Sequence, residues 1–210
     1  MSGLGRNWAK YWGNRKINWK TSYFDTWDHP HRKFIIRVLQ SINWVSLFEV
    51  GCGAGANFVQ IVKNFPTGKQ LGGQDINKDA IETAKIMFNH AILKIGPSDD
   101  IMMSDNSTDV ILTDRCLMYL SPIKIGKTIE EIKRVSRGYV VFAELHSTSW
   151  VDRIKLFINS GYYAHNYLKL LEKHGFYDII SYKTPREYWP QGEKLYKFDH
   201  IILAKVPTRK

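Results

Sequence analysis

The chain has 210 residues, of which 44% are hydrophobic and 24% charged, with 15 Gly and 7 Pro. This length suits one domain, residues 1–210, and the composition excludes disordered, collagenous and low-complexity proteins. No apolar run approaches the roughly 20 residues that cross a bilayer, and no apolar block follows the basic start, so we expect a cytoplasmic protein without a membrane partner. The two cysteines, Cys52 and Cys116, lack disulfide or zinc spacing and predict free thiols and no metal.

The positive charge is concentrated at the two ends of the chain. Residues 1–40 carry a net charge of +6, residues 41–150 of −1 and residues 151–210 of +5, which add up to the total of +10. Basic ends suit an anionic partner such as RNA, although a basic soluble surface gives the same totals without one. RNA is therefore kept as a possible partner, and the sequence carries no indication of an oligomeric state.

The first segment, residues 1–30, is predicted to be an aromatic and basic cap. Its aromatic residues are interleaved with Lys and Arg and show no strand or helix period, so the segment covers either a sheet edge or the ligand site. The aromatic residues are Trp8, Tyr11, Trp12, Trp19, Tyr23, Phe24 and Trp27.

From residue 31 the pattern alternates between helical and strand periods. Such alternation predicts right-handed crossovers and an α/β fold: a doubly wound, seven-stranded, mostly parallel, Rossmann-like sheet with an antiparallel C-terminal strand. The predicted helices span residues 31–42, 54–64, 78–88, 122–135 and 163–174, and the predicted strands 45–50, 71–75, 91–95, 109–113, 138–144, 177–183 and 198–206.

A glycine loop between the first strand and its helix is the strongest motif. Gly51, Gly53 and Gly55 permit a tight turn and a close backbone approach by a nucleoside or a pyrophosphate. Twenty residues later, Asp75 ends the second strand, where its carboxylate can accept both hydroxyls of a ribose. The combination predicts a nucleoside-containing cofactor.

These motifs resemble those of the class I S-adenosylmethionine-dependent methyltransferases. The acidic residue before the loop is Glu49, the Gly-x-Asp of the second motif is matched by residues 73–75, and residues 105–112 look like the family's approach to its fourth strand. The resemblance covers residues 45–145 and implies S-adenosylmethionine as the cofactor. It assigns Asp75 to the ribose and Ile76 to the adenine.

The resemblance is incomplete on the adenine side. Where relatives have Gly-Asp-Ala, this chain has Gly-Pro-Ser at residues 96–98, so we expect Ser98 and Asp99 near the adenine. Thr113, at the end of the fourth strand, completes the expected cofactor site. His29, His31 or Arg32 is expected to reach the methionine carboxylate.

A nicotinamide dinucleotide site is the main alternative for the glycine loop. Gly51, Gly53 and Ala56 also fit the dinucleotide fingerprint. Glu49 weighs against this alternative, because an acidic side chain suits the ammonium of S-adenosylmethionine and would repel a pyrophosphate.

The acceptor is expected beyond the carboxyl ends of the fourth and fifth strands. His146 is the candidate base because its ordinary pKa lies near neutrality, and Asp114 is expected to orient it or to bind a cationic acceptor. In the alternative interpretation, Asp114 pairs with Arg115 and His146 is a solvated loop residue. A second aromatic group, Tyr162, Tyr163, His165, Tyr167 and Trp189, is expected to enclose the acceptor pocket.

Three functions remain open from the sequence. Residues 113–116 do not fit the motif of enzymes that methylate amino groups of nucleic-acid bases, which favours methylation of a small molecule. RNA methylation through the basic ends is the second hypothesis. The third is a non-catalytic nucleoside-binding or scaffold protein, because fold alone does not establish function.

Overall fold

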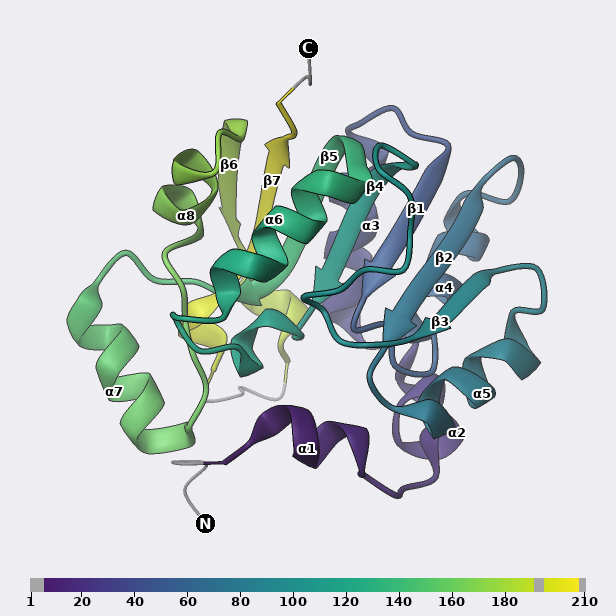
Figure 1. Ribbon diagram of the computed structural model, residues 1–210, viewed down its shortest axis with the longest axis horizontal. Helices are drawn as coiled ribbons and strands as arrows, with labels where there is room; N and C mark the ends of the chain where they lie inside the picture. Colours follow the sequence, from purple (N-terminus) through teal and green to yellow (C-terminus); the bar gives the residue numbers. More distant parts are fainter. Residues whose placement is uncertain (1–5, 191–194, 208–210) are drawn as a thin grey trace.

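The computed structural model describes residues 6–190 and 195–207, so part of the predicted N-terminal cap, residues 1–5, lies outside the described residues. Its seven strands form one sheet in the order β3-β2-β1-β4-β5-β7-β6 (Figure 1). The strands are β1 Ser46–Val50, β2 Gln70–Asp75, β3 Ile92–Ile95, β4 Thr108–Asp114, β5 Ser136–Leu145, β6 Tyr177–Lys183 and β7 Asp199–Lys205.

The strand directions confirm the predicted fold class. Strands β1 to β5 run parallel, while β7 pairs antiparallel with both β5 and β6. The chain builds outward from β1 to β3 and then returns to the other side of β1 with β4. This reversal between β1 and β4 is the point of an open α/β sheet at which ligands bind, beyond the carboxyl ends of the strands.

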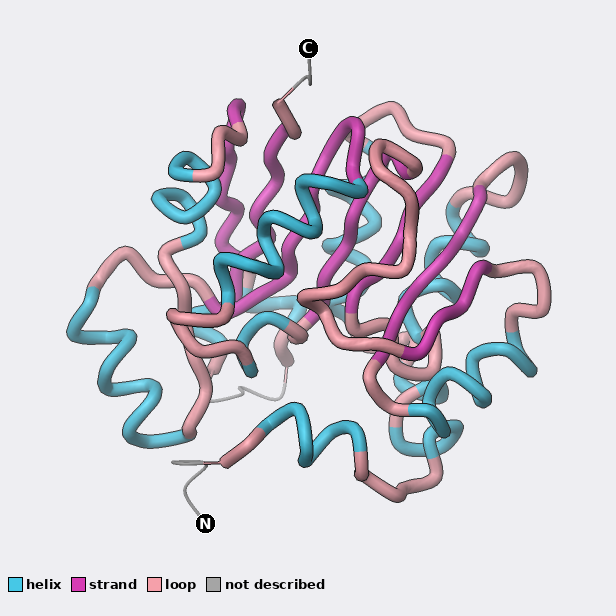
Figure 2. The backbone as a smooth tube through the Cα atoms, viewed as in Figure 1, coloured by secondary structure: helices cyan, strands magenta, loops and turns pink. Residues whose placement is uncertain are grey.

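Helices cover both faces of the sheet (Figure 2). Along each central strand, successive side chains alternate between two apolar clusters: Ile111 and Phe142 pack with α6 and α8, and Leu112 and Val141 pack with α3, α4 and α5. Burial on both faces explains why the strands read as continuous apolar runs. These helices are α3 Pro30–Gln40, α4 Ala56–Asn64, α5 Lys78–Met87, α6 Ile125–Val135 and α8 Tyr167–Lys173.

Between residues 6 and 29, the N-terminal segment contains two short α-helices, a turn of 3-10 helix at Phe24–Thr26 and no strand. Helix α1, Trp8–Gly13, has no buried residue, and α2, Trp19–Ser22, buries Trp19. Three contacts tie the segment down across its length. The Trp8 indole N–H donates to the Gly161 carbonyl (3.2 Å), and the Asn77 amide donates to the carbonyls of Trp12 (2.6 Å) and Arg15 (3.0 Å).

The region between β5 and β6 differs from the prediction. Helix α7, Trp150–Ser160, was not predicted, and the helix expected over 163–174 begins only at Tyr167. Asn166 caps it, because its side chain accepts a hydrogen bond from the Lys169 amide (3.3 Å). Residues 162–165 therefore form a loop rather than the first turn of that helix.

Within residues 6–190 and 195–207, no helix is long and apolar enough to cross a membrane. The same residues contain no group of three or more His, Cys, Asp or Glu side chains placed to hold a metal ion.

Candidate active site

A cleft of about 690 Å³ opens at the carboxyl ends of β1, β2 and β4. The glycine loop, the end of β2 and the start of the turn after β4 form its floor, and residues of α1 and α2 line it from the opposite side. Of the predicted site residues, the cleft is lined by Arg32, Glu49, Gly51, Gly53, Asp75, Ile76, Ser98, Asp99 and Asp114.

Three glycines of the loop have left-handed backbone angles, but they serve different purposes. A Cβ on Gly51 would overlap the Cys116 thiol, whereas one on Gly53 would project toward the cleft, with Tyr23 the nearest neighbour at 3.9 Å. Gly55 is not a cleft residue, contrary to its predicted role. A Cβ there would meet Phe88 at 3.0 Å, so this glycine permits close packing of α4.

Hydrogen bonds from backbone amides hold the Asp75 side chain beside the glycine loop. Its two carboxylate oxygens accept hydrogen bonds from the backbone amides of Gly53 (2.9 Å) and Asn77 (2.8 Å). Burial raises the pKa of Asp75 above its ordinary value, and these hydrogen bonds oppose the shift. The neighbouring Gln74 was not predicted: its amide donates to the carbonyls of Pro97 (2.6 Å) and Asp100 (2.8 Å) and so holds the loop that carries Ser98 and Asp99.

Glu49 is buried at the base of the cleft with one oxygen unpartnered. The Asn57 amide donates to its Oε1 (2.6 Å), while no described group donates to Oε2. Burial raises the pKa of Glu49 to about 8. Asn57, which the sequence analysis missed, lies in the first turn of α4 directly after the glycine loop, and that position is the signal that could have identified it.

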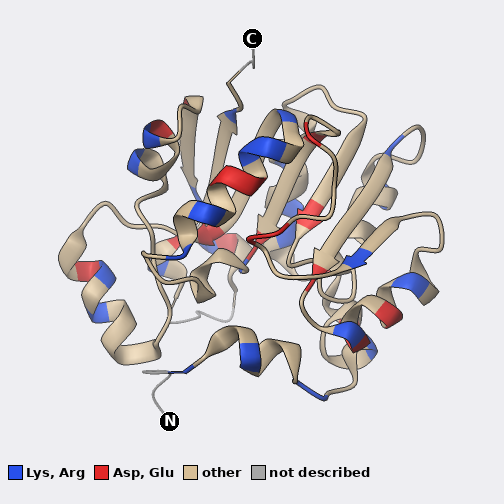
Figure 3. Cartoon of the chain, in the orientation of Figure 1, with Lys and Arg blue, Asp and Glu red and all other residues tan. Residues whose placement is uncertain are grey.

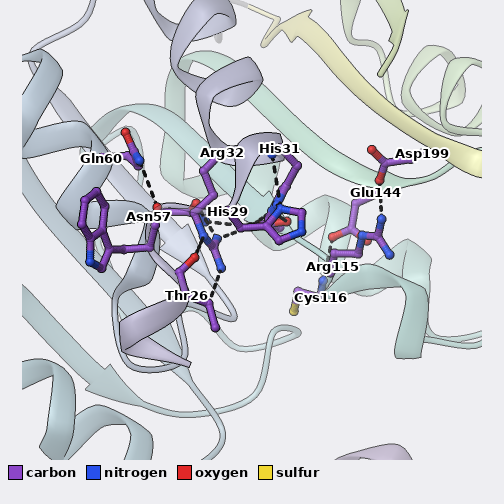
Figure 4. A network of polar contacts seen from close by, with 12 residues as sticks. Thr26, His29, His31, Arg32, Asn57, Gln60, Arg115, Cys116, Glu144 and Asp199 are labelled. Carbon is purple, nitrogen blue, oxygen red and sulfur yellow. Dashed lines mark hydrogen bonds and ion pairs between the residues drawn. The ribbon is translucent and has the colours of Figure 1, made fainter. Parts of the chain in front are cut away.

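Asp114, at the end of β4, lies at the centre of a buried polar network. Figure 4 shows its partners His31, Arg32 and Asn57 pointing toward one another. The Asp114 Oδ2 accepts hydrogen bonds from Arg32 (2.6 Å), His31 (3.0 Å) and Asn57 (3.1 Å). Burial alone would raise the pKa of Asp114, but the adjacent His31 and Arg32 hold it well below its ordinary range. Asp114 is therefore an anion at neutral pH.

This network corrects two predicted partners of Asp114. The residue orients His31 rather than His146, and Arg115 turns away to Asp199, with 2.7 Å between the Arg115 guanidinium and the Asp199 carboxylate. Arg32 lines the cleft, yet its guanidinium is already engaged with Asp114 and with the Asn57 side-chain oxygen (2.7 Å).

His31 is fixed on three sides. Its Nδ1 lies 2.7 Å from Nδ1 of His29, its Nε2 faces Asp114, and its ring stacks on Trp189 with 5.0 Å between ring centroids. Burial lowers the pKa of His29 to about 4, so His29 is neutral at physiological pH. The Trp189 indole N–H in turn donates to Asp199 (2.6 Å), which anchors the stack to β7.

The structure does not bring His146 or Thr113 into the cleft. The His146 side chain is 5% exposed, and its Nδ1 accepts a hydrogen bond from the Tyr167 amide (3.2 Å). The backbone continues β5 past Leu145, because the His146 amide donates to the Phe198 carbonyl (2.7 Å), and this path turns the ring toward Tyr167 and His200. Burial lowers the pKa of His146 to about 4. Thr113 is fully buried.

The turn after β4 is held by a carboxylate of the next strand. Glu144 accepts hydrogen bonds from the backbone amides of Cys116 and Leu117, both at 2.9 Å, and burial raises the pKa of Glu144 to about 7. This arrangement positions Tyr119, whose ring packs against Trp8 with 4.9 Å between centroids. Glu144 thereby holds the turn that carries Tyr119 to the N-terminal segment.

Of the second aromatic group, only Tyr163 lines the cleft. Tyr162 supports the wall from behind, with 5.3 Å between its ring centroid and that of Trp8. Tyr167 is fully buried in the core, His165 bonds to the Leu120 carbonyl (3.0 Å), and Trp189 lies behind His31. The expected enclosure of the cleft therefore depends mainly on the N-terminal aromatic residues.

Comparisons with known proteins agree with this geometry. Residues 47–138 match a protein family described as a methyltransferase domain. No curated protein matches the chain by sequence.

Three solved structures illustrate the structural likeness. Phosphoethanolamine N-methyltransferase 2 of Haemonchus contortus has a TM-score of 0.69 at 14% identity, over 100% of this chain and 62% of that one. Geranyl diphosphate C-methyltransferase of Streptomyces coelicolor A3(2) has a TM-score of 0.63 at 15% identity, over 84% and 75%. The cyclase SpnF has a TM-score of 0.66 at 16% identity, over 85% and 81%.

Residues 47–138 thus match a methyltransferase domain, and the chain has the same fold as these three structures. The Haemonchus contortus enzyme was solved with S-adenosyl-L-methionine and the geranyl diphosphate enzyme with S-adenosyl-L-homocysteine.

Proposed function

We propose that the protein is a single-domain, cytoplasmic enzyme that transfers the methyl group of S-adenosylmethionine to a small-molecule acceptor inside the cleft. The shape of the cleft is the observation that carries this proposal. Its volume of about 690 Å³ lies in the range of small-molecule sites, and the aromatic residues of α1 and α2 line the side opposite the glycine loop. A folded RNA would need a flipped base to enter such a cleft.

The residues present fit the cofactor. The unpartnered Oε2 of Glu49 suits the ammonium of the methionine part, Asp75 suits the ribose hydroxyls, and the missing side chain of Gly53 leaves room for a close approach. Ile76, Ser98 and Asp99 would surround the adenine. When bound, the cofactor supplies a methyl group already activated on a sulfonium.

Asp114 is proposed as the group that positions the acceptor. It lines the cleft at the end of β4, and His31 and Arg32 keep it ionised. A carboxylate with so low a pKa is a weak base at neutral pH, so Asp114 would bind a cationic or hydrogen-bond-donating part of the acceptor rather than remove its proton. His146, which the structure buries outside the cleft, has no part in this proposal.

The structural neighbours support a small acceptor without identifying it. One is a geranyl diphosphate methyltransferase and another a phosphoethanolamine methyltransferase. The likeness of SpnF, a cyclase, shows that the fold also carries other reactions, so turnover has to be measured.

The cofactor site is tested by calorimetry with S-adenosylhomocysteine and with NAD. We expect binding of the former only, and Asp75→Ala should weaken it by about 1.5–3 kcal/mol, the contribution of charge-assisted hydrogen bonds. Glu82→Ala is the matched control, because that carboxylate lies on the surface and pairs with Lys85 of the same helix. Equal affinities for wild type and Asp75→Ala would place the ribose elsewhere.

The acceptor class is tested by cofactor turnover with cell extract divided into small-molecule and RNA fractions. The proposal requires turnover with the small molecules. Turnover with RNA alone would establish an RNA methyltransferase, and tight cofactor binding without turnover in either fraction would support a nucleoside-binding role.

A further inference from the structure

Helix α7 exposes most of its apolar side chains to solvent. Trp150, Val151, Ile154 and Ile158 are 66%, 39%, 48% and 54% exposed, whereas Leu156 is the helix's buried residue. Residues 150, 154 and 158 are four apart and share one face, with Val151 beside them. We call these four residues the α7 face.

Helix α7 is attached to the rest of the fold through residues outside the α7 face. Leu156 joins the small cluster formed by Met118, Leu145, Ala164 and Phe198, and the Ser149 hydroxyl caps the helix by accepting from the Asp152 amide (3.2 Å). A single exposed apolar residue is ordinary, but a contiguous stripe on a helix usually marks an interaction site. In Figure 1, α7 projects from the body of the molecule, which leaves its outer side accessible.

The charges on α7 favour an anionic partner. The helix carries the exposed Lys155 next to the apolar stripe, and its acidic residue, Asp152, is paired with Lys197 at 3.2 Å. Figure 3 shows both basic and acidic positions on α7. The chain as a whole has a net charge of +10, so two copies would repel each other if they met through this face. A tryptophan and branched aliphatic residues beside basic ones form the pattern of helices that lie in a lipid interface.

We propose that the α7 face docks the protein on the surface of an anionic lipid membrane. Trp150, Ile154 and Ile158 would enter the boundary between head groups and acyl chains, and Lys155 would contact the lipid phosphates. The absence of a spanning segment led the sequence analysis to expect no membrane partner. A short helix that lies on a surface, however, has no such segment.

Docking would also orient the cleft. Phe157 of the same helix lines the cleft, and the Trp8 indole bonds to the Gly161 carbonyl at the end of α7. One wall of the cleft therefore belongs to the helix that carries the α7 face. A membrane-bound enzyme would receive acceptors from the head-group region.

The test is co-sedimentation of the full-length protein with vesicles of phosphatidylcholine alone or mixed with phosphatidylglycerol. We expect sedimentation with the anionic vesicles only, weakened by salt. Ile154→Ser with Ile158→Ser should reduce the bound fraction about tenfold or more. Ile86→Ser with Met87→Ser, exposed apolar residues of α5, is the matched control and should bind as wild type does.

Three further measurements separate membrane docking from other outcomes. Anionic vesicles should shift the tryptophan emission of wild type to the blue, and Trp150→Phe should lose most of that shift while it still sediments. Circular dichroism shows whether the variants remain folded. Equal sedimentation of wild type and the Ile154, Ile158 variant would overturn the proposal, as would a wild-type dimer in light scattering that this variant converts to a monomer.

Discussion

Glu49 combines complete burial, one amide donor and one unpartnered oxygen. Because burial raises the pKa of Glu49 to about 8, the free protein holds this carboxyl mostly protonated at neutral pH. An ammonium beside it would favour the charged form and lower its pKa in the complex. Cofactor binding should therefore release a proton from Glu49.

This linkage predicts a pH-dependent affinity. Below pH 8, the association constant for S-adenosylhomocysteine should rise with pH, by at most about tenfold per unit, and it should level off above pH 8. Calorimetry in buffers of different ionisation enthalpy measures the proton released. Glu49→Gln should abolish both effects, and a wild-type affinity that stays constant from pH 6 to 8 would contradict the linkage.

His146 is expected to contribute to stability rather than to turnover. Its ring accepts the Tyr167 amide at the start of α8, so His146→Ala would leave a buried donor without a partner and should lower the free energy of unfolding by about 1–3 kcal/mol. Denaturant unfolding measures this loss, and turnover should remain within a few-fold of wild type. An unchanged unfolding free energy with turnover reduced a hundredfold would identify His146 as the base after all.

At the scale of elements, the N-terminal segment is held at two distant points, near Gly161 and at Asn77. The Asn77 side chain has two separable roles, since its oxygen caps α5 by accepting from the Ala80 amide (3.1 Å), while its nitrogen donates to the segment. Asn77→Asp keeps the cap and removes the donor.

Asn77→Asp should therefore release the segment without unfolding α5. We expect trypsin to cleave at Lys10, Arg15 or Lys16 several-fold faster in this variant, and S-adenosylhomocysteine to slow cleavage of wild type more than of the variant. Mass spectrometry identifies the cleavage sites. Asn159→Asp serves as the control, because it makes the same change at an exposed position. Identical cleavage rates in the variant and the control would show that the segment is held by packing alone.

All seven strands could be predicted from the sequence to within two residues. Burial on both faces leaves apolar runs in the central strands, whereas the exposed edge strands β3 and β6 follow from the alternation with helices. Side chains that follow a strand end were harder to place. Asp114 reaches the cleft and His146 does not, and the difference arises from how β5 continues toward β7, a tertiary contact without a local signal. Helix α7 was not predicted either. Most of its apolar residues face outward, so they do not follow the pattern of a helix packed on a core.

For the whole molecule, several basic side chains near the two ends of the chain are paired with surface carboxylates. Lys16, Lys20 and Lys205 each contact a carboxylate at 2.7–2.9 Å, so the basic ends of the chain are not continuous tracks of free cations. The proposed small-molecule function therefore predicts little dependence of turnover on salt.

Salt titration distinguishes the two classes of acceptor. An RNA strand bound through several phosphates would lose affinity with a slope near −0.7 per phosphate in a plot of log affinity against log salt concentration. We expect the Michaelis constant for the small acceptor to vary far less over the same range. A steep decline together with RNA-dependent turnover would favour RNA methylation.

The cleft lies between a rigid floor on the sheet and a covering segment fastened at Asn77 and Gly161. Suppose that release of a ligand held between them requires one of these fastenings to open. Detachment of the segment, rather than methyl transfer, would then limit the steady state, and the first turnover would give a burst of product before the slower cycle begins. The hydrogen bonds of the Trp8 and Asn77 side chains would thus determine the turnover rate, although the methyl transfer takes place elsewhere in the cleft.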